Sequence, residues 1–197
     1  MVEHVKRSCE RAAALQSGID PRALDVPGLT CPEIRHLLNN LVSMEGCRYL
    51  EIGCYQGATF LSAMSNNQPV AHWAIDSFGQ FGNMKDRFLK NCDRLGVAPN
   101  LVVRDCFSFN PLGGGNISGV NVYFYDGRHS EEEQHRALVH YAPSFAKEFV
   151  YVCDDWRGAR VCAGTEAAVK ELKLTEKFRA IFSSWWEGLG VFVFELT

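Results

Sequence analysis

Continuous apolar runs alternate with helix-like segments along most of this chain, and this alternation constrains the fold more than any other feature. The apolar runs lack the polar alternation of a half-exposed strand, which is typical of strands buried on both faces. Strands that alternate with helices predict a mainly parallel sheet. The predicted strands cover residues 47–53, 70–76, 101–104, 121–126, 149–154, 178–183 and 191–196.

Helices are expected between these strands and before the first of them. The predicted helices cover residues 2–16, 58–65, 83–95 and 164–172, with two more that begin at Thr30 and Ser130 as Ser/Thr-x-x-Glu capping boxes. Only a few residues separate the last two strands, so these must form an antiparallel hairpin. We therefore expect an α/β fold: a Rossmann-like, doubly wound, seven-stranded sheet, mainly parallel with the last strand antiparallel, and helices on both faces.

The chain length suits one domain. With 197 residues it can bury a sizeable core. Residues 1–46 are interpreted as an N-terminal helical and connector segment, and residues 47–197 as the core. No stretch has the composition of an interdomain linker, so the expected domain covers residues 1–197.

The composition limits the kinds of binding partner and the cellular compartment that we expect. A net charge of −3 and a pI near 6.1 give no electrostatic reason to expect nucleic acid or an anionic membrane as a partner. The eight cysteines include no C-x-x-C pair, which argues against a zinc or disulfide framework and favours a reducing compartment. No apolar stretch resembles a signal core or a membrane span. We therefore expect a cytoplasmic protein.

A glycine turn follows the first predicted strand, in the stretch YLEIGCYQGATF. Glu51 precedes Gly53 and Gly57, and Asp76 ends the next strand 19 residues after Gly57. Glycines let the backbone turn sharply beneath a ligand, and an acid about 20 residues after such a turn is typical of ribose binding. The pattern E-x-G-x-x-x-G is not the G-x-G-x-x-G of dinucleotide sites, which argues against a nicotinamide cofactor. An ordinary strand-to-helix turn is the alternative interpretation.

Carboxylates end two later strands, in the stretches YFYDGRHS and YVCDDW. Asp126, Asp154 and Asp155 would meet at one sheet edge, where they repel one another and raise one another's pKa. Mg²⁺ or another hard divalent cation relieves such repulsion. The alternatives left open are a helix-capping role for Asp155, a plain strand end for Asp126 and a surface role for His129.

The motifs LEIGCYQG, AIDSF, RDCFSF and YFYDGRHS, in this order, resemble those of class I S-adenosylmethionine-dependent methyltransferases. The D-x-x-H motif and the later Asp pair are similar to the metal-dependent O-methyltransferases of natural-product sugars and their relatives. The resemblance implies S-adenosyl-L-methionine as cofactor. The implied cofactor-binding residues are Glu51, Gly53, Cys54, Tyr55, Gly57, Thr59, Asp76, Ser77, Asp105, Cys106 and Asp126.

The same resemblance implies the chemistry. Asp126, Asp154 and Asp155 would hold Mg²⁺, and His129 would act as general base beside Asp126. The expected function is Mg²⁺-assisted O-methylation of a small molecule with adjacent oxygens. Two differences from the family pattern leave the identity of the methyl acceptor undecided. The stretch SEEEQ follows the histidine where relatives place an aromatic residue, and no inserted substrate lid is evident.

Other functions remain open at this stage. One is a metal-independent methyltransferase acting on another acceptor, and another is a methyltransferase-like domain that binds without catalysis. Trp185, Trp186, Phe78 and Phe81 are expected either to wall the acceptor pocket or to pack against the sheet edge. The expected partner is a small-molecule acceptor, with no nucleic acid or membrane partner, and a homo-oligomer is possible.

Overall fold

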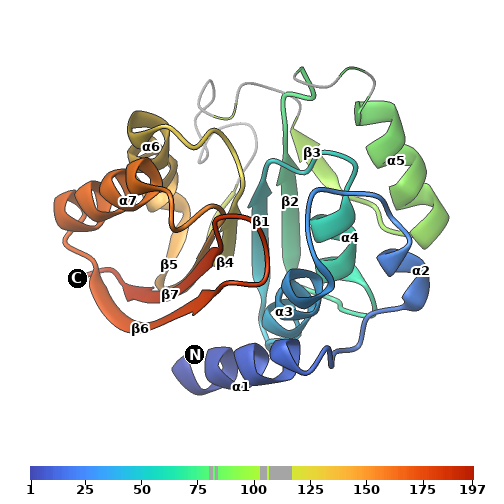
Figure 1. Cartoon of the computed structure of the whole chain (residues 1–197), viewed down its shortest axis with the longest axis horizontal. Coiled ribbons are helices and arrows are strands. Elements are labelled where there is room, and N and C mark those ends of the chain that lie inside the picture. Colours follow the sequence, from blue (N-terminus) through green and yellow to red (C-terminus); the bar gives the residue numbers. More distant parts are fainter. Residues whose placement is uncertain (80–81, 83, 103–105, 107–116) are drawn as a thin grey trace.

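A computed structural model describes residues 1–79, 82, 84–102, 106 and 117–197 of the chain. Among these residues, seven strands form one sheet in the order β3-β2-β1-β4-β5-β7-β6 (Figure 1). The neighbouring pairs from β3 to β5 are parallel, and β7 is antiparallel to both of its neighbours. The strand bounds are β1 Arg48–Ile52, β2 Ala71–Ile75, β3 Asn100–Val102, β4 Val120–Tyr125, β5 Phe145–Cys153, β6 Thr175–Phe182 and β7 Leu189–Glu195.

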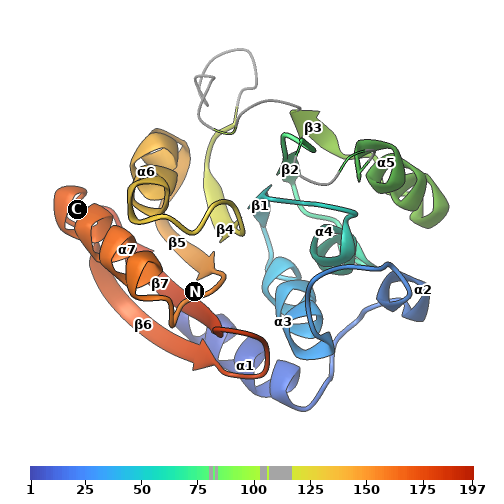
Figure 2. The same cartoon turned by 45° about the horizontal axis from the view of Figure 1, so that its top comes forward.

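Helices cover both faces of this sheet (Figures 1 and 2). Helices α1, α3, α4 and α5 pack on one face, and α6 and α7 pack on the other. The helix bounds are α1 Val2–Ala13, α2 Pro21–Leu24, α3 Pro32–Val42, α4 Ala58–Met64, α5 Met84–Leu95, α6 Glu131–Tyr141 and α7 Ala159–Glu171, with a 3-10 turn at Ala142–Ser144. The predicted mixed α/β, Rossmann-like architecture is confirmed. In the part of the chain that is described, no helix combines the length and the apolar character needed to cross a bilayer.

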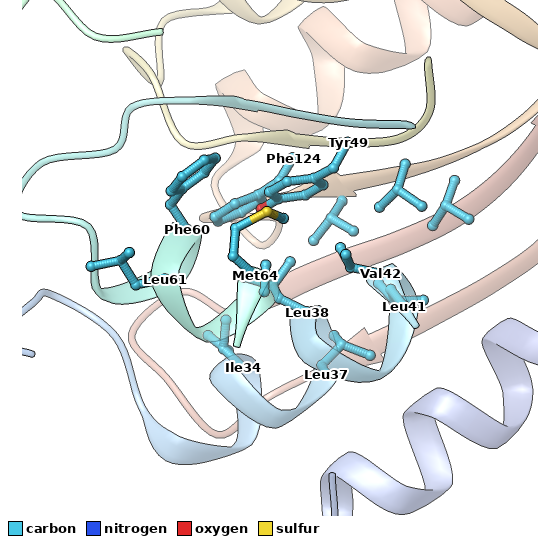
Figure 3. Packing of buried hydrophobic residues seen from close by; sticks show 14 of the residues in the cluster. Ile34, Leu37, Leu38, Leu41, Val42, Tyr49, Phe60, Leu61, Met64 and Phe124 are labelled. Carbon is cyan, nitrogen blue, oxygen red and sulfur yellow. The ribbon is translucent and has the colours of Figure 1, made fainter. Parts of the chain in front are cut away.

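One hydrophobic core lies between the sheet and helices α3 and α4. Tyr49 of β1 and Phe124 of β4 point from the sheet toward Phe60 and Met64 of α4, and Leu38 of α3 packs behind them (Figure 3). Successive side chains of a strand point to opposite faces, so Leu50 and Ile52 of β1 enter a second core beneath α6 and α7. The sheet is buried on both faces, as the continuous apolar runs predict.

The two predicted capping boxes have different outcomes. Ser130 is the N-cap of α6, and its hydroxyl accepts a hydrogen bond from the amide of Glu133 at 3.2 Å, as predicted. The prediction for Thr30 is wrong: α3 begins after Cys31, and the Thr30 hydroxyl has no hydrogen-bond partner. The proline at the first position of α3 moves the helix start one residue beyond the predicted cap.

The predicted start of α7 is also wrong. The helix begins at Ala159 rather than at Gly164, so this glycine lies inside it. A side chain on Gly164 would place its Cβ 2.2 Å from the carbonyl oxygen of Glu131 in α6. Gly164 therefore lets two helices pack closely and does not mark a helix boundary. Residues 83, 103 and 104, at the ends of two predicted elements, lie outside the described residues. Other predicted elements differ from the structure at their ends, most of all β5, which begins at Phe145 rather than at Phe149.

Candidate functional site

The carboxyl ends of four neighbouring strands lie side by side at one edge of the sheet. The register pairs Ile52 of β1 with Ile75 of β2 and with Tyr125 of β4, and it pairs Tyr125 with Cys153 of β5. Each strand ends at its paired residue. The first residues beyond the strands therefore form a row, in the order Asp76, Gly53, Asp126 and Asp154. Ligands of open parallel sheets bind beyond this edge, beside the point where the strand order reverses.

Backbone hydrogen bonds continue the sheet by one residue into this row. The amide of Gly53 donates to the carbonyl of Ile75, and the amide of Asp126 donates to the carbonyl of Ile52, both at 2.9 Å. The amide of Asp154 donates to the last carbonyl of β4 at 3.2 Å. The sheet itself therefore positions these residues, which gives a site more precision than mobile loops would.

Asp76 organises the loops that follow β1 and β2. Its carboxylate oxygens accept hydrogen bonds from the amides of Tyr55 at 2.8 Å and Phe78 at 2.6 Å. Tyr55 and Phe78 have φ angles of 48° and 52°, in the left-handed region. Such a conformation costs a residue other than glycine about 1–3 kcal/mol. The carboxylate bonds to the amide of each strained residue and so holds both loops in one arrangement.

Gly53 is required by a backbone contact. Its φ is +91°, and a Cβ there would lie 1.8 Å from the carbonyl oxygen of Asp126. Gly57, with φ +92°, lies at the N-cap of α4, where a Cβ would meet Leu61 and Phe88 at 3.1 Å. The structure thus explains both glycines of the turn by packing within the chain.

Glu51 is fully buried beneath the glycine turn. Its oxygens accept hydrogen bonds from the hydroxyls of Tyr49 at 2.5 Å and Thr59 at 2.7 Å. Burial raises the pKa of Glu51 to about 8, although these two hydrogen bonds act in the opposite direction. Glu51 therefore joins β1 to the first turn of α4, which is a structural contact at a residue predicted to bind the cofactor.

Three carboxylates and an imidazole come together after β4 and β5; we call Asp126, His129, Asp154 and Asp155 the acidic cluster. The Nε2 atom of His129 lies 3.6 Å from Oδ1 of Asp126 and 3.6 Å from Oδ2 of Asp155. One ligand atom from each of Asp126, His129 and Asp154 lies within 4.8 Å of the others. The sequence predicts a metal set of three aspartates, whereas this group of three contains His129 in place of Asp155.

The three aspartates of the acidic cluster carry more negative charge than its one histidine can neutralise. Burial, followed by the charges of Asp126 and Asp155, raises the pKa of Asp154 to about 8. Burial acts to lower the pKa of His129, but the hydrogen bond and charge of Asp126, together with the other two carboxylates, outweigh it and raise this pKa. A bound cation would relieve the same repulsion. Carboxylate oxygens that lie this close together fit a hard divalent cation such as Mg²⁺ or Mn²⁺.

A cleft of about 990 Å³ opens above the row of strand-end residues. The predicted site residues that line it are Gly53, Cys54, Tyr55, Thr59, Asp76, Ser77, Cys106, Asp126, His129, Asp154 and Asp155. Two predicted site residues in the described part of the chain, Glu51 and Gly57, do not line the cleft. Phe78, Trp185 and Trp186 line the cleft as well. Asp105 and Phe81 lie outside the described residues.

Sequence reasoning missed part of the cleft wall. The unpredicted lining residues include Gly28, Leu29, Thr30, Met84, Arg128 and Glu133. The first three belong to the connector, by which we mean residues 14–31 between α1 and α3. The buried guanidinium of Arg35 donates to the carbonyls of Ala23, Leu24 and Val26 and so ties the connector to α3.

Residues 183–188 between β6 and β7 form a turn that we call the tryptophan turn. The amides of Trp156 and Arg157 donate to the carbonyls of Gly188 and Glu187 at 3.0 and 2.9 Å. The guanidinium of Arg157 donates to the hydroxyl of Ser183. The tryptophan turn is therefore fastened to the loop that carries Asp154 and Asp155.

Comparisons with known proteins identify the fold. No protein-family model matches this chain, and no curated protein matches it. The O-methyltransferase from Bacillus cereus, in complex with SAH, superposes with a TM-score of 0.65 at 14% identity over 98% of this chain and 91% of that one. The fold is that of class I methyltransferases.

Two further structures share this fold at equally low identity. PH1948 from Pyrococcus horikoshii, described as an RNA methyltransferase, has a TM-score of 0.63 at 14% identity over 98% of this chain and 99% of that one. SMU.776, complexed with SAH, has a TM-score of 0.64 at 14% identity over 86% of this chain and 50% of that one. The present chain therefore matches about half the length of SMU.776.

Proposed function

We propose that this protein binds S-adenosylmethionine and transfers its methyl group to a hydroxyl oxygen of a small molecule that carries two adjacent oxygens. A divalent cation, with Mg²⁺ as the expected ion, would assist the transfer. The observation that carries the proposal is the acidic cluster, which lies in the cleft at the carboxyl edge of a class I methyltransferase sheet. Two of the structures that share the fold hold SAH, which supports the choice of cofactor.

The proposed cofactor site lies above β1 and β2. Gly53, Tyr55 and Ser77 line this side of the cleft, and Cys106 lies further along it. Asp76 already accepts one backbone hydrogen bond at each oxygen. Each carboxylate oxygen can accept a second one, so Asp76 can receive the hydroxyls of a ribose without losing its role in the loops.

The proposed cation site lies above β4 and β5. Asp126 and Asp154 would hold the ion, with Asp155 as the third carboxylate. Burial and the two neighbouring carboxylates disfavour the ionised form of Asp154 in the free protein, and a bound cation would relieve this cost. When bound, the cofactor supplies an electrophilic methyl group, and the cation lowers the pKa of the acceptor hydroxyl.

His129 is the proposed general base. Its Nε2 faces Asp126 and Asp155, whose charges favour the imidazolium that forms when it accepts the hydroxyl proton. The deprotonated oxygen would then form a bond to the methyl carbon as the carbon–sulfur bond of the cofactor breaks, and the electron pair of that broken bond would stay on sulfur. Asp126 contacts His129 and so orients the imidazole throughout this proton transfer.

Methylation of RNA is the second candidate, because PH1948 shares the fold. The net charge of −3 and the acidic cluster disfavour it, since a phosphate backbone needs cationic contacts. A domain that binds a ligand without catalysis is the third candidate. Such a function does not explain why carboxylates that repel one another face the cleft.

The test begins with calorimetric titration of SAH into the full chain. Methyl transfer from labelled S-adenosylmethionine is then followed to 1,2-dihydroxybenzene, to cis-1,2-cyclohexanediol and to transfer RNA, each with Mg²⁺ or with EDTA. We expect SAH binding and Mg²⁺-dependent methylation of a diol. Failure to bind SAH would refute the proposal, and EDTA-resistant transfer would remove the cation from it. Labelling of RNA alone would establish the second candidate, whereas SAH binding without any transfer would favour the binding domain.

A further inference from the structure

Glu133 of α6 lines the cleft with a carboxylate that the protein leaves partly unsatisfied. Its Oε2 atom is buried and has no hydrogen-bond partner. Its Oε1 atom lies 3.9 Å from Nη1 of Arg128, which is longer than a hydrogen bond, and the side chain of Arg128 is itself 84% exposed. A buried acceptor without a donor is unfavourable. The side chain of Glu133 keeps 26% of its surface exposed, so a ligand in the cleft can bring it a donor.

The start of α6 does not account for this carboxylate. The hydroxyl of Ser130 accepts a hydrogen bond from the amide of Glu133, which is one half of a capping box. In the other half the glutamate side chain accepts from the amide of the N-cap residue, but Oε2 of Glu133 accepts no hydrogen bond. Glu131 and Glu132 are exposed in the same turn and supply the negative charge that favours a helix N-terminus. The helix start therefore has its acids without a third one in the cleft.

Glu133 and Cys106 lie on the same side of the cleft. The hydroxyl of Tyr141, at the end of α6, donates to the carbonyl of Cys106 at 2.6 Å and holds this residue beside the helix. Burial raises the pKa of Tyr125, and Cys106 and Glu133 raise it further, so both side chains lie near the hydroxyl of Tyr125. Helix α6 packs on the sheet face opposite to α4. This side of the cleft is therefore across the sheet edge from the glycine turn that precedes α4.

The order of groups in S-adenosylmethionine indicates which of them would reach Glu133. The ribose, with Asp76 as its proposed contact, carries the sulfur on one side and adenine on the other. The sulfur has to face the acidic cluster for methyl transfer, so adenine would extend away from it, to the side that Cys106 lines. An ionised carboxylate can only accept hydrogen bonds. The exocyclic amine of adenine is a donor of the kind that Glu133 lacks.

We propose that Glu133 accepts a hydrogen bond from the exocyclic amine of adenine and so makes the cofactor site specific for this base. The inference rests on the proposed function and adds a specificity-determining residue to its cofactor site. In hypoxanthine a carbonyl oxygen replaces the amine, and the carboxylate of Glu133 repels it. The stretch SEEEQ, which differs from the family pattern, then serves the cofactor and not the methyl acceptor.

The test compares SAH with S-inosylhomocysteine, which carries hypoxanthine in place of adenine. Calorimetry in EDTA measures both affinities without a contribution from a divalent cation. We expect the unmodified protein to bind SAH at least about tenfold more tightly than S-inosylhomocysteine. Glu133→Ala should reduce this preference to less than about twofold, mainly by weakening SAH.

Two further variants sharpen the comparison. Glu133→Gln keeps the size of the side chain and an oxygen acceptor, and its amide can also turn to donate to a carbonyl. It should therefore retain SAH binding and bind S-inosylhomocysteine more tightly than the unmodified protein does. Glu132→Ala, an exposed change in the same turn and outside the cleft lining, should leave the preference for SAH unchanged.

The outcomes separate this inference from the proposed function. If the unmodified protein binds both ligands equally tightly, adenine specificity is refuted while binding of the cofactor stands. If Glu133→Ala lowers both affinities by the same factor, or lowers neither, Glu133 does not contact the amine and the inference is again refuted alone. If neither ligand binds to the unmodified protein, the proposed function fails and takes this inference with it.

Discussion

Gly53 and Asp126 touch through their backbones, with a distance of only 1.8 Å between the carbonyl oxygen of Asp126 and the position that a Gly53 Cβ would take. The contact joins the loop proposed to hold the cofactor to the strand end that begins the acidic cluster. The two halves of the proposed site therefore cannot be adjusted independently at this point.

Gly53→Ala is expected to destabilise the fold by at least about 2 kcal/mol, since it adds a backbone clash to the strain of a left-handed alanine. The shift of Asp126 that relieves the clash should also weaken binding of both SAH and Mn²⁺. Urea denaturation gives the free energy of unfolding, and calorimetry gives the two affinities.

Gly46→Ala is the matched control for this change. Gly46 has φ +70°, but nothing lies within 4 Å of its Cβ position. The left-handed backbone conformation is then the sole source of strain in Gly46→Ala, and it costs an alanine about 1 kcal/mol. An equal loss of stability in both variants would show that the contact with Asp126 carries no extra cost.

Asp154→Asn should have opposite effects on stability with and without a cation. Burial and two neighbouring carboxylates raise the pKa of Asp154 to about 8, so its ionised form destabilises the free protein. At pH 8.5 in EDTA, we expect the variant to melt at a higher temperature than the unmodified protein. With saturating Mn²⁺ the order should reverse, because the variant binds the ion at least about tenfold more weakly.

Glu45→Gln, an exposed change in the turn between α3 and β1, serves as the control for the loss of one charge. It should leave both melting temperatures and the Mn²⁺ affinity unchanged. Unaltered Mn²⁺ binding by Asp154→Asn would remove Asp154 from the cation site.

Glu51→Gln should flatten the dependence of stability on pH. Because burial raises the pKa of Glu51 from 4.5 to about 8, the folded protein keeps a proton that the unfolded chain releases. This contribution to stability is complete below about pH 4.5 and is lost as the pH rises through 8. Asp154 contributes with the same sign, so the comparison is made in an Asp154→Asn background. Urea denaturation from pH 5 to pH 9 in EDTA measures the free energy of unfolding at each pH. A steeper decline of this free energy with pH in Glu51→Gln would contradict a raised pKa at Glu51.

The strand-end row was the part of the site that the sequence could predict. Gly53, Asp76, Asp126 and Asp154 each follow an apolar run directly, and parallel strands of one sheet bring such residues to the same edge. The positions of these four residues at one sheet edge can therefore be predicted from local sequence alone.

Contacts between distant segments were beyond such reasoning. The hydrogen bond between Glu51 and Thr59 could not be predicted, because Thr59 reaches Glu51 only after α4 has docked. Leu29 lies in a turn-rich connector whose place at the cleft depends on the hydrogen bonds of Arg35. Gly164 was predicted to begin a helix, since glycine disfavours helix interiors. Its role in the close packing of α7 on α6 depends on a contact with Glu131 that local sequence does not show.

Gly164→Ala tests this last interpretation, because helix propensity and packing predict opposite results. Propensity alone would stabilise α7 by about 1 kcal/mol. The new Cβ would lie 2.2 Å from the carbonyl oxygen of Glu131, so we expect a net loss of about 1–3 kcal/mol and a shift of α6, whose start adjoins His129. Ala167→Gly, at an exposed position of the same helix, measures the propensity term without a packing change. Urea denaturation of both variants decides the matter: a more stable Gly164→Ala would show that α6 and α7 adjust freely and that the glycine does not set their spacing.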